Sequence, residues 1–230
     1  MMKKLLLILL CFPMIGFGQN VYIPDANFKA YLLSEPYINT NGDSEIQASE
    51  ASAFGGEIMC YGDSISDLIG IEAFTALTEF ACAENQLTSL DVSTNTALWG
   101  LSCHDNQLTT LDVSALTYLN DLECSYNQLT SLDVRNGNNT DDWDFWTNAN
   151  PNLTCINVDN AAWSTANWIG VGFSFDPQHY FSNNCSGMSI QEQTTNKELL
   201  KAIDLLGRET PYRKNTPLFY IYDDGTVEKR

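Results

Sequence analysis

The sequence predicts a solenoid of stacked turns that share one parallel sheet. The turn at 98–113 has counterparts at 77–92 and 119–134. A fixed spacing of 21 residues between equivalent positions is typical of a solenoid, in which each turn contacts only its neighbours. Two series of residues follow this spacing, namely Asn85, Asn106 and Asn127 and, three residues before each, Cys82, Cys103 and Cys124.

The composition of one turn explains why turns must stack. In the turn at 98–113, Leu101 and Cys103 alternate with Ser102, so a short strand points the first two side chains inward. Burial of the inward ring contributes on the order of 10 kcal/mol, less than the cost of ordering about 21 residues. A single turn is therefore unstable alone. The other inward residues of this turn are Leu98, Leu108, Leu111 and Val113.

The pattern L-x-x-L-x-C-x-x-N-x-L in these turns resembles the leucine-rich repeat. The resemblance implies an α/β-type leucine-rich repeat solenoid, here of about five turns over residues 55–158. In the fifth turn we expect Trp143 and Phe145 in the two inward slots, and Asn148 continues the asparagine series 21 residues after Asn127. The ends of such an array need caps. We expect a helix–loop–helix cap at 19–54, a second cap at 159–187 and a small β tail at the C-terminus.

The N-terminus reads as a secretory signal peptide at 1–18. Lys3 and Lys4 precede the apolar run 5–10, and Gly16 and Gly18 provide small residues for cleavage before Gln19. The run is short for a membrane span, and we expect no span elsewhere in the chain. The sequence therefore predicts a protein that is secreted or located at the outer cell surface.

Charge is unevenly distributed along the chain. Residues 20–187 contain Lys29 and Arg135 against 22 Asp and Glu, a net charge of −20, whereas residues 188–230 carry no net charge. The acidic body should repel nucleic acid, and it could attract cations or basic partners. The alternative explanation is solubility alone, because an acidic surface keeps an extracellular protein soluble.

The cysteines divide into two groups. Cys60, Cys82, Cys103 and Cys124 occupy the inward slot, where parallel side chains suit a disulfide poorly, so we expect small buried core residues. A metal ladder is disfavoured because the short C-x-x-C spacing of zinc sites is missing. Cys155 and Cys185 lie outside this series. An oxidising compartment predicts a disulfide between them.

The segment 39–50 matches a twelve-residue calcium loop. Carboxylate, amide and carbonyl oxygens fall at positions 1, 3, 5, 7 and 12, the positions that bind structural Ca²⁺. Ser44 stands where glycine is expected, which predicts strain there. The alternative is an ordinary polar turn that binds nothing. The predicted ligands are Asn39, Asn41, Asp43, Glu45 through its carbonyl, and Glu50.

The C-terminal part changes character after 187. Residues 188–197 are polar and read as a linker, and 198–230 contain D-L-L-G-R-E and Y-I-Y-D-D-G-T-V-E-K-R. These stretches resemble the C-terminal sorting domain of type IX secretion cargo, which implies the type IX secretion machinery as a partner. The body resembles the leucine-rich repeat passengers that carry such tails, through I-P-D-A-N-F-K-A-Y-L and N-Q-L-T-S-L-D-V. This likeness implies binding or adhesion.

The exposed strand face is the predicted binding site. Alternation along the strands places Asp121 and Asp142 in one column, Glu123 and Asp144 in a second, and His104 and Trp146 in a third. Acids framed by aromatic rings suit a basic protein patch or a glycan. The predicted binding residues are Trp99, His104, Asp121, Glu123, Tyr126, Asp142, Asp144 and Trp146.

Two other classes compete with a binding protein. A secreted structural spacer would use the same fold without a ligand. A hydrolase would need Ser102, His104 and a neighbouring acid as nucleophile, base and orienter, but an open sheet face excludes no water. The sequence therefore predicts a protein that is not an enzyme.

Overall fold

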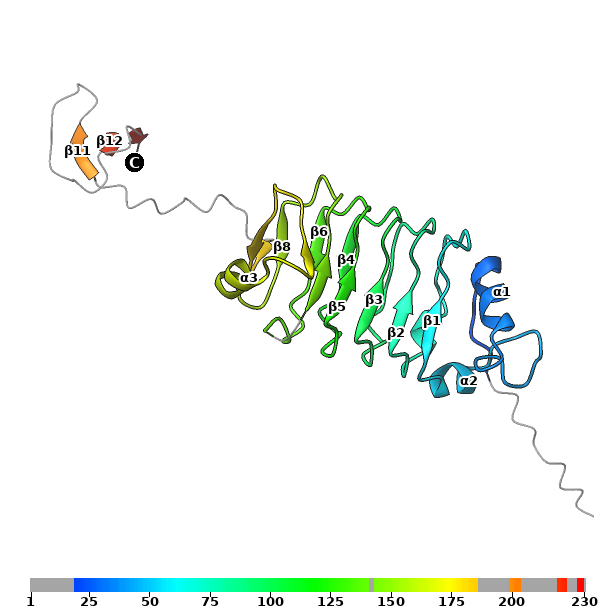
Figure 1. Cartoon of the computed structure of the whole chain (residues 1–230). Helices are drawn as coiled ribbons and strands as arrows, with labels where there is room; N and C mark the ends of the chain where they lie inside the picture. Colours follow the sequence, from blue (N-terminus) through cyan, green and yellow to red (C-terminus); the bar gives the residue numbers. More distant parts are fainter. Residues whose placement is uncertain (1–18, 141–142, 186–198, 204–218, 223–226, 230) are drawn as a thin grey trace, which may run out of the picture. The chain divides into compact units, whose positions relative to one another are not determined.

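The computed structural model describes residues 19–140, 143–185, 199–203, 219–222 and 227–229. The chain divides into two compact units, with the boundary between Cys185 and Ser186 (Figure 1). The predicted signal peptide at 1–18 and the linker at 188–197 lie outside the described residues.

The first unit is a solenoid built on a six-stranded parallel sheet, as the repeat pattern predicts. Each strand comes from a successive turn, and the strands follow one another along the solenoid (Figure 1). The structure therefore has six turns where the sequence predicts about five, because residues of the predicted C-terminal cap add the last strand. The strands are β1 (Glu57–Met59), β2 (Glu79–Ala81), β3 (Gly100–Ser102), β5 (Asp121–Glu123), β7 (Asp144–Trp146) and β9 (Phe173–Ser174).

A second parallel sheet corrects the prediction of a single one. Its four strands lie in the order β10-β8-β6-β4. Segments such as Thr110–Asp112 alternate polar and apolar residues, so a three-residue strand buries Leu111 and leaves its neighbours exposed. The strands are β4 (Thr110–Asp112), β6 (Ser131–Asp133), β8 (Cys155–Asn157) and β10 (Tyr180–Ser182). A short 3-10 helix, η1 (Ile71–Ala73), precedes β2.

The core is continuous along the solenoid. The inward slots of the main sheet are fully buried, and the four repeat cysteines are free and buried as predicted. Burial raises the pKa of Cys60 and of Cys124 to about 12, so these thiols stay protonated and act as apolar side chains. The central inward positions are Ile58, Phe80, Leu101, Leu122 and Phe145.

A ladder of asparagines closes each turn after its strand. Asn106 donates to the carbonyls of Cys82, Cys103 and His104 and accepts from the backbone of Leu87. Buried backbone groups need partners, and these side chains supply them where the chain bends. The residue before each ladder asparagine has a positive φ. The equivalent ladder members are Asn85, Asn127 and Asn150.

The fifth turn has a register that differs from the prediction. Leu122 pairs with Phe145 and Glu123 with Trp146, so Phe145 fills the first inward slot and Thr147 the second. The expected assignment of Trp143 and Phe145 to these slots is therefore wrong by two residues. Asn150, not Asn148, continues the ladder for the same reason.

Two short helices form the N-terminal cap, in agreement with the predicted helix–loop–helix. Asp25 caps α1 (Ala26–Ser34) and also accepts hydrogen bonds from the backbone and hydroxyl of Ser66 in the first turn. A capping box of Gln47 and Glu50 begins α2 (Ala48–Ala53). Phe28 and Leu32 of α1 are buried against the solenoid core.

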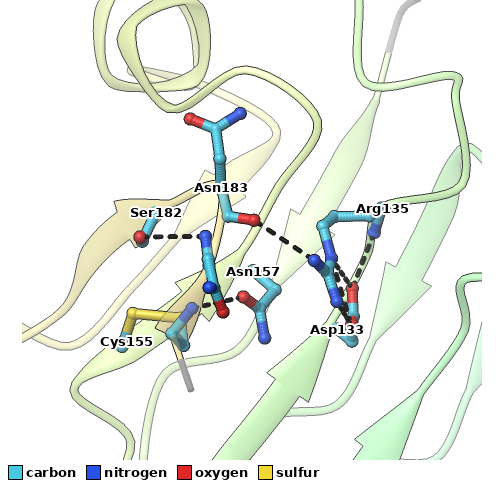
Figure 2. The surroundings of a disulfide bond; sticks show 8 residues. Asp133, Arg135, Cys155, Asn157, Ser182 and Asn183 are labelled. Carbon is cyan, nitrogen blue, oxygen red and sulfur yellow. Dashed lines mark hydrogen bonds and ion pairs between the residues drawn. A yellow bond between two sulfur atoms is a disulfide. The ribbon is translucent and has the colours of Figure 1, made fainter. Parts of the chain in front are cut away.

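The C-terminal end is closed by aromatic packing and a disulfide. Helix α3 (Ala161–Asn167) is capped by Asn160 and lies between β8 and β9. Trp168 is buried and packs edge-on against Phe145, which shields the last turns. The predicted disulfide between Cys155 and Cys185 is confirmed, and it joins the start of β8 to the end of this unit (Figure 2).

The second unit contains the predicted small β tail. Its three described strands form an antiparallel sheet in the order β11-β12-β13. Antiparallel pairing of β12 with β13 is what the Asp-Gly hairpin signal predicts. The strands are β11 (Leu199–Ile203), β12 (Phe219–Tyr222) and β13 (Val227–Lys229).

Candidate functional site

An open depression of about 370 Å³ lies at the C-terminal ends of the strands of the main sheet, over its last four turns. Four of the eight predicted binding residues line it together: His104, Glu123, Tyr126 and Trp146. We call this surface the acidic-aromatic depression. Its other lining residues are Asp105, Ser125, Asn148 and Ser174.

The sheet register places the two principal side chains beside each other. Glu123 ends β5 and Trp146 ends β7, and these two residues are direct partners in adjacent strands. Neighbouring strands in a sheet lie about 4.8 Å apart, so both side chains can contact one ligand group. Tyr126 follows β5 in a loop with a positive φ of 54°. Trp146 is 37% exposed and Tyr126 57% exposed.

A polar network links His104 to the acids around it. His104 Nδ1 lies 2.8 Å from Asp105 Oδ2, and Nε2 lies 3.8 Å from Glu123 Oε2. Ser102 donates its hydroxyl proton to the same Glu123 oxygen at 3.1 Å. The serine proton therefore goes to the acid and not to the histidine. This direction does not match a nucleophile activated by a base.

A column of carboxylates runs beside the depression on the first strand position. Glu57, Glu79, Asp121 and Asp144 belong to it, with Gly100 between the second and third. Burial, with added repulsion from Asp144 and Glu123, raises the pKa of Asp121. Burial also raises the pKa of Glu79, and the charges of Glu57 and Asp121 add to it. A cation bound here would relieve this repulsion.

Three of the predicted residues do not line the depression. Asp121 and Asp144 pair with each other in the carboxylate column, so the expected pairing of Asp144 with Glu123 is wrong. Trp99 precedes β3 at the opposite end of the strands and is 43% exposed. The remaining predicted residue, Asp142, lies outside the described residues.

Sequence reasoning missed the polar residues that complete the lining. Asn148 was assigned to the ladder, but the longer fifth turn frees it to accept a hydrogen bond from Ser125 at 3.0 Å. Asp105 directly follows His104 and was not considered. Ser174 belongs to β9, a strand of the sixth turn that the sequence analysis did not predict. A correct register for β7 would have identified Asn148.

Four of the predicted calcium ligands lie in the loop between α1 and α2, and the fifth, Glu50, lies in the first turn of α2. Asp43 is exposed, and its carboxylate accepts hydrogen bonds from the Glu45 backbone and from the side chains of Asn41 and Gln47. The positive φ of this loop occurs at Gly42 and not at Ser44, so the expected strain at Ser44 is absent. The loop therefore turns two residues earlier than a calcium hand would.

A separate groove of about 780 Å³ lies between the N-terminal cap and the first turn. Tyr37, Phe54 and Glu57 are among its lining residues, and Tyr37 is largely exposed. Its apolar part comes from residues of the cap that have no repeat periodicity, and the sequence analysis did not identify it.

Comparisons with known proteins address the repeat region. No protein-family model matches the chain. A stretch of 77 residues is 37% identical to Internalin J of Listeria monocytogenes serotype 4b, strain F2365, and covers 33% of this chain and 8% of that protein. The chain therefore spans less than a tenth of the length of this curated relative.

Two solved structures from Listeria monocytogenes are similar to this one. The functional domain of InlJ, described as including a cysteine ladder, has a TM-score of 0.43 and 28% identity, over 61% of this chain and 38% of that one. The internalin InlF has a TM-score of 0.46 and 18% identity, over 63% of this chain and 46% of that one. In the part of the chain described here, no helix has the length and apolar character needed to cross a membrane. With its 21-residue pattern and its parallel solenoid, the chain has the fold of a leucine-rich repeat solenoid, and 77 of its residues are similar to Internalin J.

Proposed function

We propose that this protein is a secreted or cell-surface binding protein, and that the acidic-aromatic depression recognises a protein or glycan partner. The observation that carries the proposal is the pairing of Glu123 with Trp146, which both line this open, acidic surface. Carboxylates beside exposed aromatic rings bind cationic groups through charge pairing and cation–π contact. A basic segment of an extracellular protein is the partner that this chemistry favours.

The negative charge of the depression supports a basic partner, because the Lys and Arg side chains of the body pair with acids elsewhere. The two basic residues between 20 and 187 are both engaged elsewhere. Lys29 pairs with Glu45 in the N-terminal cap at 2.8 Å, and Arg135 pairs with Asp133 in the second sheet. Within the described residues, His104 is therefore the one basic partner of the acids on the main sheet face. Binding a Lys or Arg side chain would supply one.

The aromatic residues distinguish this proposal from a structural spacer. A spacer gains nothing from Trp146 and Tyr126 exposed at one depression, whereas rigid aromatic side chains contribute strongly to protein and sugar recognition. Glycan binding would use the face of Trp146 for stacking and the carboxylates as hydrogen-bond acceptors. A glycan is therefore the second class of partner that these residues could bind.

The test compares two double variants in binding to Lys- and Arg-rich peptides, to a glycan panel and to the native cell surface. Glu123→Gln with Trp146→Ala removes one charge and one ring from the depression. Asp112→Asn with Tyr118→Ala removes the same groups from positions that do not line it. We expect the first to weaken binding by roughly 10- to 100-fold, from about 0.5–2 kcal/mol for the ring and about 1 kcal/mol for the charge. Equal binding by both variants would remove the depression as the site.

We also propose that residues 198–230 direct export through the type IX secretion machinery. The resemblance of D-L-L-G-R-E and Y-I-Y-D-D-G-T-V-E-K-R to sorting domains supports this, and so does the assignment of this segment to its own compact unit. Deleting 198–230 should leave the body folded but retained in the periplasm. Fractionation that finds the truncated protein at the surface in normal amounts would contradict the proposal.

A further inference from the structure

We propose that the loop at 39–50 binds one Ca²⁺ ion, and that this ion holds the N-terminal cap on the solenoid. The starting point is Asn39, the first of the expected ligands. Its side chain is buried, with 8% of the residue exposed, and its Oδ1 atom has no hydrogen-bond partner among the described residues. A buried polar oxygen without a partner carries a free-energy penalty, which a bound cation would remove.

The Asn39 side chain is directed into the loop. Its Nδ2 atom donates to the carbonyl of Asp43 at 3.0 Å and to the carbonyl of Leu33 at 3.3 Å. The amide is therefore fixed between the end of α1 and the loop. Its oxygen belongs to the same planar group, so these two bonds fix the position of the oxygen as well.

Other oxygens of the predicted set converge on one position, which a donor nitrogen occupies. Gln47 Nε2 lies 3.2 and 3.4 Å from the two carboxylate oxygens of Asp43 and 3.3 Å from the carbonyl oxygen of Glu45. An amide N–H presents a partial positive charge to these acceptors, at a point where a cation would present a full one. Ca²⁺ prefers six to eight oxygens, and rotation of Gln47 would open this position to it.

Glu50, at the last position of the predicted calcium loop, also holds the loop in shape. Glu50 Oε1 accepts hydrogen bonds from the backbone of Thr40 and Asn41, and Oε2 accepts from the backbone of Gln47. These bonds already set the loop shape, and they lower the pKa of Glu50 against the opposing effect of its burial. In the described residues no group of three or more acidic, histidine or cysteine side chains could hold a metal. The site therefore relies on two carboxylates supplemented by amide and carbonyl oxygens, which suits the weak affinity of extracellular calcium modules.

The loop is connected to the elements that dock on the first turn. Lys29 of α1 pairs with Glu45 at 2.8 Å, and the backbone of Val21 donates to the carbonyl of Ile46 at 2.8 Å. Helix α1 in turn contacts the first turn through Asp25 and Ser66. An ion bound in the loop would therefore stabilise the cap and, through it, the exposed end of the repeat array.

The experiment measures Ca²⁺ binding to the full chain by calorimetry, together with its melting temperature in Ca²⁺, in Mg²⁺ and in chelator. We expect one ion per chain. At Ca²⁺ about tenfold above the dissociation constant, the melting temperature should rise by about 3–6 °C relative to chelator. Mg²⁺ at the same concentration should give a smaller rise, because it requires tighter octahedral geometry.

The variants are Asp43→Asn and a matched control, Asp91→Asn. Both aspartates are exposed, and each accepts a hydrogen bond from the backbone two residues ahead, but Asp91 lies in a repeat turn. We expect Asp43→Asn to lose the Ca²⁺-dependent rise and the calorimetric signal, and Asp91→Asn to keep both. Because Asp43 is on the surface, its replacement should not prevent folding. No binding to the unmodified chain, or equal binding by both variants, would overturn the proposal.

Discussion

Replacing Asn106 by alanine should destabilise the solenoid far more than its single polar side chain suggests. Asn106 accepts a hydrogen bond from the backbone N–H of Leu87 at 2.9 Å, and this N–H has no other partner among the described bonds. It also donates to the carbonyls of Cys82, Cys103 and His104 at 3.0 to 3.2 Å. The side chain therefore links two successive turns.

The magnitude follows from which groups lose their last partner. The three carbonyls each keep another donor, for example Asn85 for Cys82 and the backbone of Glu84 for His104. Losing the three hydrogen bonds from Asn106 to these carbonyls should therefore cost little free energy. The N–H of Leu87 is left buried without an acceptor, which costs about 1–3 kcal/mol. The cavity left by the amide adds to this, so we expect about 2–4 kcal/mol in total.

The assay is urea unfolding, followed by circular dichroism, of Asn106→Ala and of a neighbouring control, Gln107→Ala. Gln107 is exposed, so its replacement should change stability by less than about 0.5 kcal/mol. Asn106→Asp should be worse than alanine at neutral pH, because it places a buried charge against three carbonyl oxygens. If Asn106→Ala costs no more than Gln107→Ala, the ladder does not stabilise the fold.

Two further predictions concern the disulfide and the carboxylate column. Replacing Cys155 and Cys185 together by serine should lower the free energy of unfolding by about 3–4 kcal/mol, since the bond spans 30 residues; denaturation curves that coincide with those of the unmodified protein would contradict this. Asp121→Asn should raise stability at neutral pH by less than about 1 kcal/mol. The folded-state pKa of Asp121 is raised, so its penalty is fully present above that pKa and is lost as pH falls through it towards the ordinary value of 3.8. The gain should therefore disappear on acidification, and a gain that is the same at every pH would contradict this.

The parts of the fold that were predictable are those that the sequence repeats. Leu101 and Cys103 point inward because alternation around Ser102 permits one arrangement, and a 21-residue spacing requires the neighbouring turns to do the same. The asparagine ladder follows because only a side chain with a donor and an acceptor can satisfy the groups at the bend. The disulfide was predictable by elimination, since Cys155 and Cys185 lie outside the repeat series.

The parts that were not predictable involve choices that alternation cannot make. The stretch Trp143-Asp-Phe-Trp146 alternates in a way that fits two registers two residues apart, because a shift of two keeps every side chain on its face. The choice is made by tertiary contacts. Trp143 packs against Trp168 at a ring distance of 5.5 Å, and Asn150 takes the ladder bonds. Neither contact can be inferred from a 21-residue period.

The irregular fifth turn also explains why the candidate site lies where it does. In a perfectly periodic array every turn presents equivalent columns, and no position along the face differs from the next. The longer turn places Trp146 beside Glu123, where the two preceding turns carry Ser102 and Ala81 in that column. It also leaves Asn148 outside the ladder, free to line the depression. The depression therefore depends on the same register of β7 that the periodic prediction missed. Removing two residues between 136 and 142 should shorten the fifth turn to the regular 21 residues, with Asn150 still in the ladder and Trp146 still beside Glu123, so binding at the depression should persist. Loss of binding by such a variant, with its fold intact by circular dichroism, would show that the site depends on the length of this turn.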